Sequence, residues 1–291
     1  MKDWIKQLEQ RHFGSSSYSQ SYQDALIDFV FDNISTVNEK PFCVEFGFNS
    51  DSLTVGTGAN VSKLVLEHGW DSLLLDGTHQ NSEINLYRHF LTPDNICGIF
   101  KQYGVPKEPE YISIDVDSLD LWLFEAILRD YRALLFSVEY NANYPLDKAI
   151  TFPNDPTEHW ERDCGYGASL RALTMVAEQN GYSLLWVIPP LDAFFIRNDL
   201  IDDGSGEIVF PFAKWKGCTG ISIHARLKRR ERVSIFMDYE VYQQTNGDIA
   251  ASRAAGRVAC EQYLLGYAGP TPLRRRLKSW MGTQLRRILG S

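Results

Sequence analysis

The chain has 291 residues, enough for one large α/β domain with an added segment. Its hydrophobic content of 44% and charged content of 23% are typical of a globular protein, and its net charge of −8 argues against nucleic acid as a partner. Five widely separated cysteines, without a Cys-x-x-Cys pair, indicate reduced thiols rather than a disulfide framework or zinc site. With no stretch resembling a signal peptide or a transmembrane span, we expect a cytoplasmic protein.

Strands and helices alternate over the first two hundred residues. Apolar positions at helical spacing predict helices over 1–12, 22–34, 60–67, 119–129 and 169–180. Short apolar runs predict strands over 42–46, 72–76, 95–100, 111–116 and 133–140, followed by a closely connected pair over 183–188 and 193–197. The pattern predicts an α/β fold, a mostly parallel sheet with helices on both faces. Because a short connection joins antiparallel neighbours only, the last strand should run against the others.

Residues 201–291 are less regular. We expect a Gly/Asp loop, a β-rich piece over 233–242, a helix over 248–267 and a basic tail over 273–291. The tail has apolar residues at helical spacing among six cations and no acid: Arg274, Arg275, Arg276, Lys278, Arg286 and Arg287. Such a basic amphipathic helix (273–289) suits an anionic membrane surface, which would make the protein peripheral. Alternatively, the helix packs on its own acidic domain or on a second copy in a homo-oligomer.

Polar residues follow the predicted strands where ligands bind in doubly wound sheets. They are Glu45, Gly47, Asp76, Asp115, Asp117, Glu139 and Asn141. An acid after the second strand can accept both hydroxyl groups of a ribose, and Asp76 has that position. The alternative for Asp76 is a residue that starts a turn.

The segment Asp115-Val116-Asp117-Ser118-Leu119-Asp120 crowds three carboxylates into one turn between a strand and a helix. Like charges repel unless a cation or hydrogen-bond donors neutralise them, and hard divalent cations such as Mg²⁺ prefer oxygen ligands. Asp115 and Asp117, with Glu139 and Asn141 from the next strand end, are therefore candidate metal ligands. The alternative is that Ser118 or Asp120 caps the following helix.

The long loop over 141–167 is rich in proline and aromatic residues, and loops of this length are often functional. It contains His159, a candidate catalytic residue, although a loop histidine is more often only solvated. Tyr166-Gly167-Ala168-Ser169 comes at a helix start, where backbone N–H groups hold an anion or ordinary capping takes place.

Several short motifs follow one another over residues 18–200. The first three are Tyr18-Ser19-Gln20-Ser21-Tyr22-Gln23-Asp24, Val44-Glu45-Phe46-Gly47 and Gly69-Trp70-Asp71-Ser72-Leu73-Leu74-Leu75-Asp76-Gly77. The others are Ile114-Asp115-Val116-Asp117-Ser118-Leu119-Asp120, Val138-Glu139-Tyr140-Asn141, Gly167-Ala168-Ser169-Leu170 and Asn198-Asp199. Together these motifs resemble the FkbM-like S-adenosylmethionine-dependent methyltransferases. Two features depart from the family pattern: Gly47-Phe48-Asn49-Ser50 is a thin glycine loop, and Tyr140 separates the acid from Asn141.

The resemblance implies a Rossmann-like class I methyltransferase fold, in which a seven-stranded, mostly parallel sheet has an antiparallel last strand. It implies a methyltransferase domain over 1–200, with N-terminal helices over 1–40, a C-terminal extension over 201–272 and the tail. Glu45 and Gly47 would border the methionine part of the cofactor, and Asp76 would hold its ribose. The cofactor-binding candidates are Gln20, Glu45, Gly47, Asn49, Asp76, Gly77 and Asp115.

The implied reaction is in-line transfer of a methyl group from a sulfonium to an oxygen, with Asp115, Asp117 and His159 as catalytic candidates and a divalent metal as helper. We expect a sugar hydroxyl as acceptor, because aromatic residues of the loop suit a saccharide face: Tyr140, Tyr144, Phe152, Trp160 and Tyr166. One alternative is a metal-dependent glycosyltransferase in which Asp115-Val116-Asp117 holds a nucleotide sugar. A second is a non-catalytic, membrane-recruited interaction protein.

Overall fold

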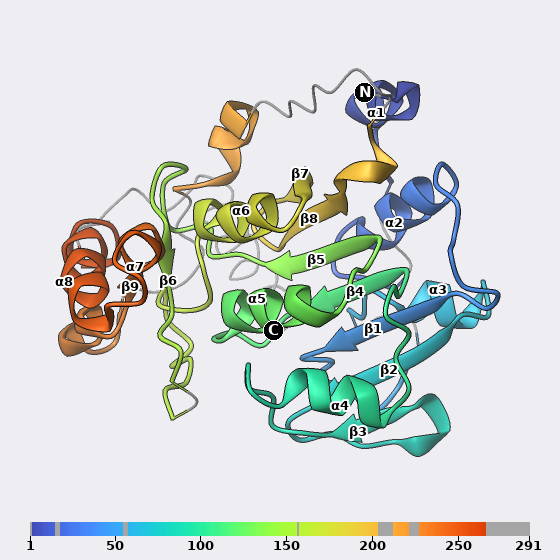
Figure 1. Ribbon diagram of the computed structural model, residues 1–291, viewed down its shortest axis with the longest axis horizontal. Coiled ribbons are helices and arrows are strands. Elements are labelled where there is room, and N and C mark those ends of the chain that lie inside the picture. Colours follow the sequence, from blue (N-terminus) through green and yellow to red (C-terminus); the bar gives the residue numbers. More distant parts are fainter. Residues whose placement is uncertain are drawn as a thin grey trace, which may run out of the picture.

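The computed structural model describes residues 2–14, 18–54, 58–155, 157–202, 212–220 and 227–265. The predicted Gly/Asp loop and the basic tail over 273–291 lie outside these residues. The element order alternates strands and helices up to residue 200 and then becomes mostly helical (Figure 1).

One seven-stranded sheet organises the protein, with strand order β3-β2-β1-β4-β5-β8-β7. The strands are β1 (Phe42–Phe46), β2 (Asp71–Asp76), β3 (Leu86–Arg88), β4 (Tyr111–Ile114), β5 (Leu135–Glu139), β7 (Tyr182–Ile188) and β8 (Asp192–Arg197). β1 to β5 pair in parallel, whereas β8 is antiparallel to both of its neighbours. The predicted mostly parallel sheet with an antiparallel last strand is confirmed.

Helices cover both faces of the sheet, as expected for strands that are mostly apolar on both faces. Val44 and Phe46 of β1 point to the face covered by α4 (Ile96–Gln102), α5 (Asp120–Asp130) and α6 (Leu170–Gln179). Cys43 points to the opposite face, where the covering helices are α1 (Asp3–Gln10), α2 (Gln23–Phe31) and α3 (Ser62–Leu66). The two apolar clusters hold the carboxyl ends of β1, β2, β4 and β5 at one edge of the sheet.

The predicted strand over 95–100 is wrong. That segment is α4, and its buried Ile96, Ile99 and Phe100 recur at helical spacing. The third strand is instead the three-residue β3, which follows a 3-10 turn (Ser82–Ile84) and a left-handed Asn85. A strand this short has too few side chains to show the period of two.

The long loop and the C-terminal extension form a smaller unit with its own apolar cluster. It contains β6 (Ile150–Thr151), β9 (Met237–Asp238), α7 (Tyr239–Gln244) and α8 (Ile249–Cys260), and it lies at the end of the sheet towards which β1 and β5 point (Figure 1). The helix over 248–267 is confirmed as far as a π-helical turn at Glu261–Leu265.

The β-rich piece predicted over 233–242 is wrong except for β9. A 3-10 turn (Arg230–Ser234) precedes this strand, and α7 follows it directly. The reason is a local cap: the side chain of Asp238 accepts a hydrogen bond from the Val241 N–H and so starts the helix.

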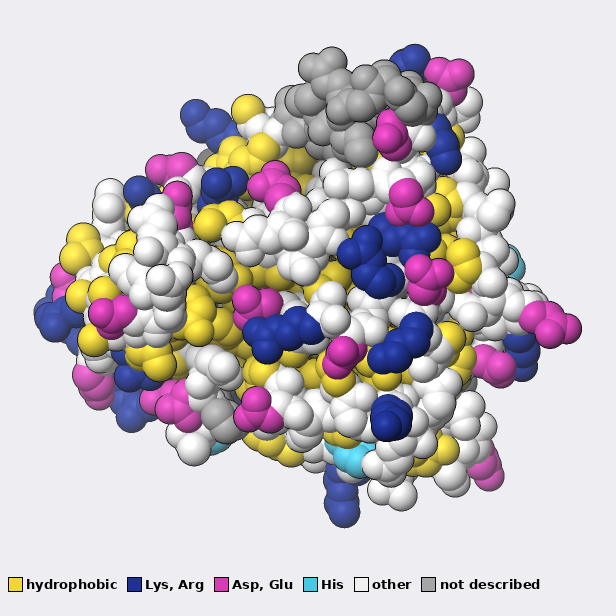
Figure 2. Space-filling view, viewed as in Figure 1, with side chains coloured by type: hydrophobic (Ala, Val, Ile, Leu, Met, Phe, Trp, Pro, Cys, Tyr) yellow, Lys and Arg dark blue, Asp and Glu magenta, His cyan; other side chains and the backbone are white. Residues whose placement is uncertain are grey.

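Basic and acidic side chains are interspersed on the face seen in Figure 2. Of the helices in the described ranges, none combines the length and apolar character needed to cross a membrane.

Candidate active site

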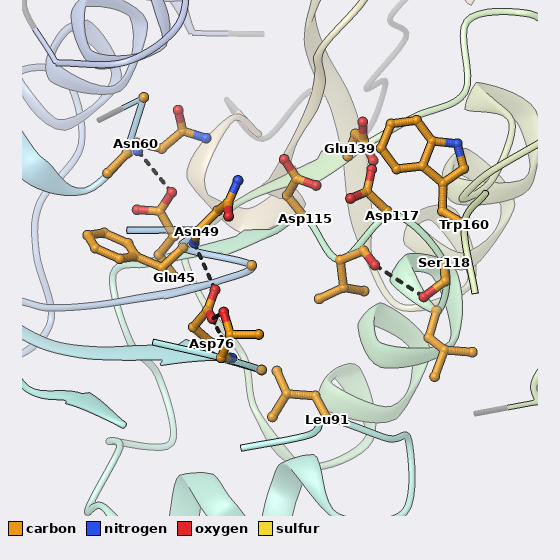
Figure 3. A pocket seen from close by; sticks show the side chains of 18 of the residues that line it. Glu45, Asn49, Asn60, Asp76, Leu91, Asp115, Asp117, Ser118, Glu139 and Trp160 are labelled. Carbon is orange, nitrogen blue, oxygen red and sulfur yellow. Dashed lines mark hydrogen bonds between the residues drawn. The ribbon is translucent and has the colours of Figure 1, made fainter. Parts of the chain in front are cut away.

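A cavity of about 1130 Å³ opens at the carboxyl edge of the sheet. It is lined by all but one of the predicted site residues: Gln20, Glu45, Gly47, Asn49, Asp76, Gly77, Asp115, Asp117, Glu139 and His159. Figure 3 shows six of these side chains at the strand ends: Glu45, Asn49, Asp76, Asp115, Asp117 and Glu139. The exception is Asn141, which does not line the cavity.

Glu45 and Gly47 shape the cavity beside the end of β1. The carboxylate of Glu45 accepts hydrogen bonds from the N–H groups of Asn60 and Val61, each at 3.0 Å, and so holds the start of α3. Burial outweighs these bonds and raises the pKa of Glu45 to about 7. Gly47 has a φ of +78°, and a Cβ there would lie 1.3 Å from the carbonyl oxygen of Asp115. Only glycine lets β1 and β4 approach this closely at the cavity floor.

Asp76, at the end of β2, is held as an ionised acceptor. Its carboxylate accepts hydrogen bonds from the N–H groups of Asn49 (2.8 Å), Thr78 (2.6 Å) and His79 (2.7 Å). Burial raises its pKa, but these backbone bonds prevail and lower the pKa to about 2. Asp76 is therefore negatively charged at neutral pH, and it also fixes the loops after β1 and β2.

Three carboxylates from two neighbouring strand ends meet on the other side of the cavity. Oxygens of Asp115, Asp117 and Glu139 lie within 4.8 Å of one another, and their side chains turn towards a common point (Figure 3). Asp117 has a φ of +59°, a left-handed conformation that directs its side chain back to Asp115. Oxygen ligands at this spacing suit a divalent cation such as Mg²⁺ or Mn²⁺.

The pKa values of the three acids are strongly raised, although each side chain remains partly exposed. Burial first, and then the neighbouring carboxylates, raise the pKa of both Asp115 and Glu139 well above the usual value. Burial also raises the pKa of Asp117 to about 6, against the opposing effect of Arg162. Oε2 of Glu139 is buried and has no hydrogen-bond partner among the described residues. Such a group is stabilised by a proton or a cation, so the donor set fits a metal ion.

The neighbouring residue Asp120 has a different task. Its Oδ1 accepts a 2.8 Å hydrogen bond from the Val116 N–H and closes the turn before α5. The alternative that Ser118 or Asp120 caps this helix is wrong, because Leu119 has the N-cap position and no side chain caps it. Asp120 is fully buried, and burial raises its pKa to about 7.

Asn141 is not available as a metal ligand. Its amide nitrogen donates to the carbonyl oxygens of Cys164 (3.0 Å) and Tyr166 (2.9 Å). Its side-chain oxygen accepts from the N–H and the side-chain amide of Asn143. Because Tyr140 separates Glu139 from Asn141, the side chain of Asn141 does not lie beside that of Glu139 and instead binds within the long loop.

The long loop supplies the outer wall of the cavity through Glu158, His159, Trp160 and Arg162. The indole of Trp160 lies beside Asp117 and Glu139 (Figure 3). The other four aromatics expected to face a saccharide are buried: Tyr140, Tyr144, Phe152 and Tyr166. Ser169 is an ordinary N-cap of α6, because its Oγ accepts a hydrogen bond from the Ala172 N–H.

The sequence patterns missed several cavity residues. Asp192 begins β8 opposite Glu139, and its carboxylate accepts a 3.0 Å hydrogen bond from Gln23. An antiparallel strand begins where its parallel neighbours end, so the start of the predicted last strand was the available signal. Phe90, just after β3, is 63% exposed at the cavity, next to Leu91. Phe90 and Leu91 were not predicted as cavity residues because the third strand was placed over 95–100 instead of before them.

No protein-family model matches this chain, and a search of curated proteins finds no significant match. The function is therefore inferred from the geometry of the cavity.

The raised pKa values predict how the metal-free protein responds to pH. The folded state keeps protons on Asp115, Asp117 and Glu139 that the unfolded chain releases above about pH 4. The contribution of these groups to stability therefore decreases as the pH rises from 5 to 8. Replacing Glu139 by glutamine should raise the melting temperature at pH 8 by about 3 °C, with little change at pH 5, and weaken Mn²⁺ binding.

Thermal denaturation in the presence of a chelator, followed by titration with Mn²⁺, measures both effects. Glu178→Gln, an exposed substitution of the same kind on α6, is the control. Equal effects of Glu139→Gln at pH 5 and pH 8 would contradict the assignment of a strained acidic triad.

Proposed function

We propose that this protein is an S-adenosylmethionine-dependent methyltransferase that acts on a hydroxyl group of a saccharide. The observation that carries the proposal is the convergence of four strand ends on one cavity. Glu45 and Gly47 come from β1, Asp76 comes from β2, and the acidic triad comes from β4 and β5. In open α/β sheets, ligands bind in this crevice.

The charge of the cavity supports a cationic cofactor. Seven carboxylates line it: Glu45, Asp76, Asp115, Asp117, Glu139, Glu158 and Asp192. Among the described lining residues, Arg162 is the one lysine or arginine. S-adenosylmethionine carries a sulfonium and an ammonium group against one carboxylate, so its net positive charge complements this lining.

Each part of the cofactor has a matching surface. Asp76 is ionised and would accept the ribose hydroxyl groups, while Phe90 and Leu91 offer an apolar surface for the purine ring. Asp192 and Glu45, together with the buried Oδ1 of Asn60, which has no hydrogen-bond partner among the described residues, are acceptors for the ammonium group. The sulfonium would then lie between Gly47 and the acidic triad.

The triad would hold a divalent ion, which lowers the pKa of a coordinated acceptor hydroxyl and stabilises the alkoxide. Asp117 or His159, which both line the cavity, would take the proton. Rate enhancement would come mainly from alignment of the hydroxyl with the methyl group. Trp160 offers one face for a sugar ring, and the acidic lining favours a neutral sugar over a sugar phosphate. We further propose a cytoplasmic location, in agreement with five free cysteines.

Release of S-adenosylhomocysteine tests the proposal. Wild-type protein with S-adenosylmethionine and Mg²⁺ is mixed with neutral glycosides, uronic acids and sugar phosphates, and Asp117→Asn serves as the impaired variant. We expect turnover with neutral glycosides and a loss of at least 100-fold in Asp117→Asn. Turnover of a nucleotide sugar with Mn²⁺, without S-adenosylhomocysteine release, would favour glycosyl transfer instead.

A further inference from the structure

The outer wall of the cavity, defined as residues 158–162, does not hold its place through the sheet. Glu158, His159, Trp160 and Arg162 line the cavity from a loop that lies between β6 and α6. His159 and Arg162 are exposed, and Arg162 has a φ of +56°. Described hydrogen bonds connect this turn to groups outside residues 158–162, namely Asp163 and Arg232, so the position of the wall depends on those groups.

Arg232, in the C-terminal extension, holds the wall from behind. Its side chain is 2% exposed. Its Nη1 contacts both carboxylate oxygens of Asp163, at 3.3 and 3.2 Å. Its Nη2 donates a 3.0 Å hydrogen bond to the carbonyl oxygen of His159. One guanidinium thereby connects a carboxylate at the end of the wall to a carbonyl in its middle.

Asp163 extends this connection in both directions. The side chain is fully buried, and it accepts 2.9 Å hydrogen bonds from the N–H groups of Gly165 and Lys228. The carbonyl oxygen of Asp163 accepts a hydrogen bond from the indole N–H of Trp160 at 2.8 Å. The orientation of the Trp160 ring in the cavity is therefore coupled to the Arg232–Asp163 pair.

Close packing fixes the same loop against the C-terminal extension. A Cβ at Gly165 would lie 2.5 Å from Leu227 and 2.9 Å from Phe236. At its far side, the loop is held by Asn141, which donates to the carbonyl oxygens of Cys164 and Tyr166. The segment after the wall is thus fixed on two sides, while the wall itself is held by the buried Arg232 and, at the surface, by the ion pair of Arg229 with Glu161.

We propose that Arg232 is a positioning residue that holds the outer wall in place for the methyl acceptor, so that the C-terminal extension determines the acceptor side of the cavity. This inference rests on the proposed methyltransferase function. Among the described residues, the polar and ring contacts of the Arg232 side chain are with His159, Asp163, Glu161 and Phe152. None of these residues belongs to the cofactor side, which β1, β2 and the loops after them form. Loss of Arg232 should therefore change acceptor binding and leave cofactor binding intact.

The test compares wild type, Arg232→Met, Arg232→Lys and Arg229→Met. Arg229→Met is the matched control, because Arg229 forms an exposed ion pair with Glu161 of the same wall, and exposed pairs contribute little. Three quantities are measured: amide hydrogen exchange of peptides covering 157–166, the dissociation constant of S-adenosylmethionine, and KM and kcat for a neutral glycoside acceptor.

In Arg232→Met, we expect exchange in 157–166 to accelerate at least tenfold, acceptor KM to rise at least tenfold, and cofactor affinity to stay within threefold. Arg232→Lys should be intermediate, because an ammonium keeps the charge beside Asp163 but does not span Asp163 and His159. Arg229→Met should resemble wild type. If Arg232→Met does not fold, Asp163→Asn provides the milder change.

Unchanged exchange in 157–166, or an unchanged acceptor KM despite faster exchange, would overturn the proposal. Equal acceleration in β1, β4 and β5, with loss of cofactor affinity, would show a general role in stability and would also overturn it. Failure of the wild type to bind S-adenosylmethionine would refute the proposed function separately, while hydrogen exchange would still decide whether Arg232 holds the wall.

Discussion

Replacing Gly47 by alanine is expected to abolish S-adenosylmethionine binding and to lower the free energy of unfolding by about 3 kcal/mol or more. The added Cβ would lie 1.3 Å from the carbonyl oxygen of Asp115, and the φ of +78° is unfavourable for any other residue. To relieve the overlap, β1 and β4 would have to separate at the cavity floor. Chemical denaturation and calorimetric titration measure the two effects.

Gly98→Ala is the matched control. Gly98 lies inside α4, and a Cβ there would meet nothing within 4 Å. This substitution should raise the free energy of unfolding by about 0.5–1 kcal/mol and leave cofactor binding unchanged. A Gly47→Ala protein as stable as wild type would show that the approach of β1 to Asp115 is not a constraint on this fold.

The second large effect is expected at Asp76. Asp76→Ala should weaken S-adenosylmethionine binding by at least 100-fold. Two hydrogen bonds from ribose hydroxyls to an ionised carboxylate contribute about 3 kcal/mol together, and the substitution also removes the acceptor for the Asn49, Thr78 and His79 N–H groups. Asp76→Asn keeps one acceptor and should be intermediate.

Asp71→Ala controls for the loss of a carboxylate from the same strand. Asp71 is the first residue of β2, at the opposite end of the strand from Asp76, and it pairs with the exposed Lys40. We expect cofactor affinity within twofold of wild type. Equal weakening by Asp71→Ala and Asp76→Ala would attribute the effect to β2 stability rather than to a contact with the cofactor.

The central part of the fold could be predicted because its strands are buried on both faces. β1, β2, β4 and β5 are short, mostly apolar runs, and each has a polar residue in or just after its carboxyl end, where ligands bind. β3 could not be predicted, since it has three residues and takes its register from β2 through Leu86, Tyr87 and Arg88. The apolar residues at the start of α4 were instead predicted as the third strand.

Prediction of the site was limited by contacts between distant segments. Glu45, Asp76, Asp115, Asp117 and Glu139 were found because each follows a recognisable strand. Asn141 also follows a strand, yet its amide is used by the long loop, and no local pattern indicates which carbonyl oxygens it will meet. The pairing of Arg232 with Asp163 across 69 residues is of the same kind.

The most direct test of this account is calorimetric titration of the wild-type protein with S-adenosylmethionine at neutral pH, in parallel with a nucleotide sugar plus Mn²⁺. We expect one S-adenosylmethionine site with a dissociation constant in the micromolar range and no binding of the nucleotide sugar. Binding of the nucleotide sugar alone, or of neither ligand, would contradict it.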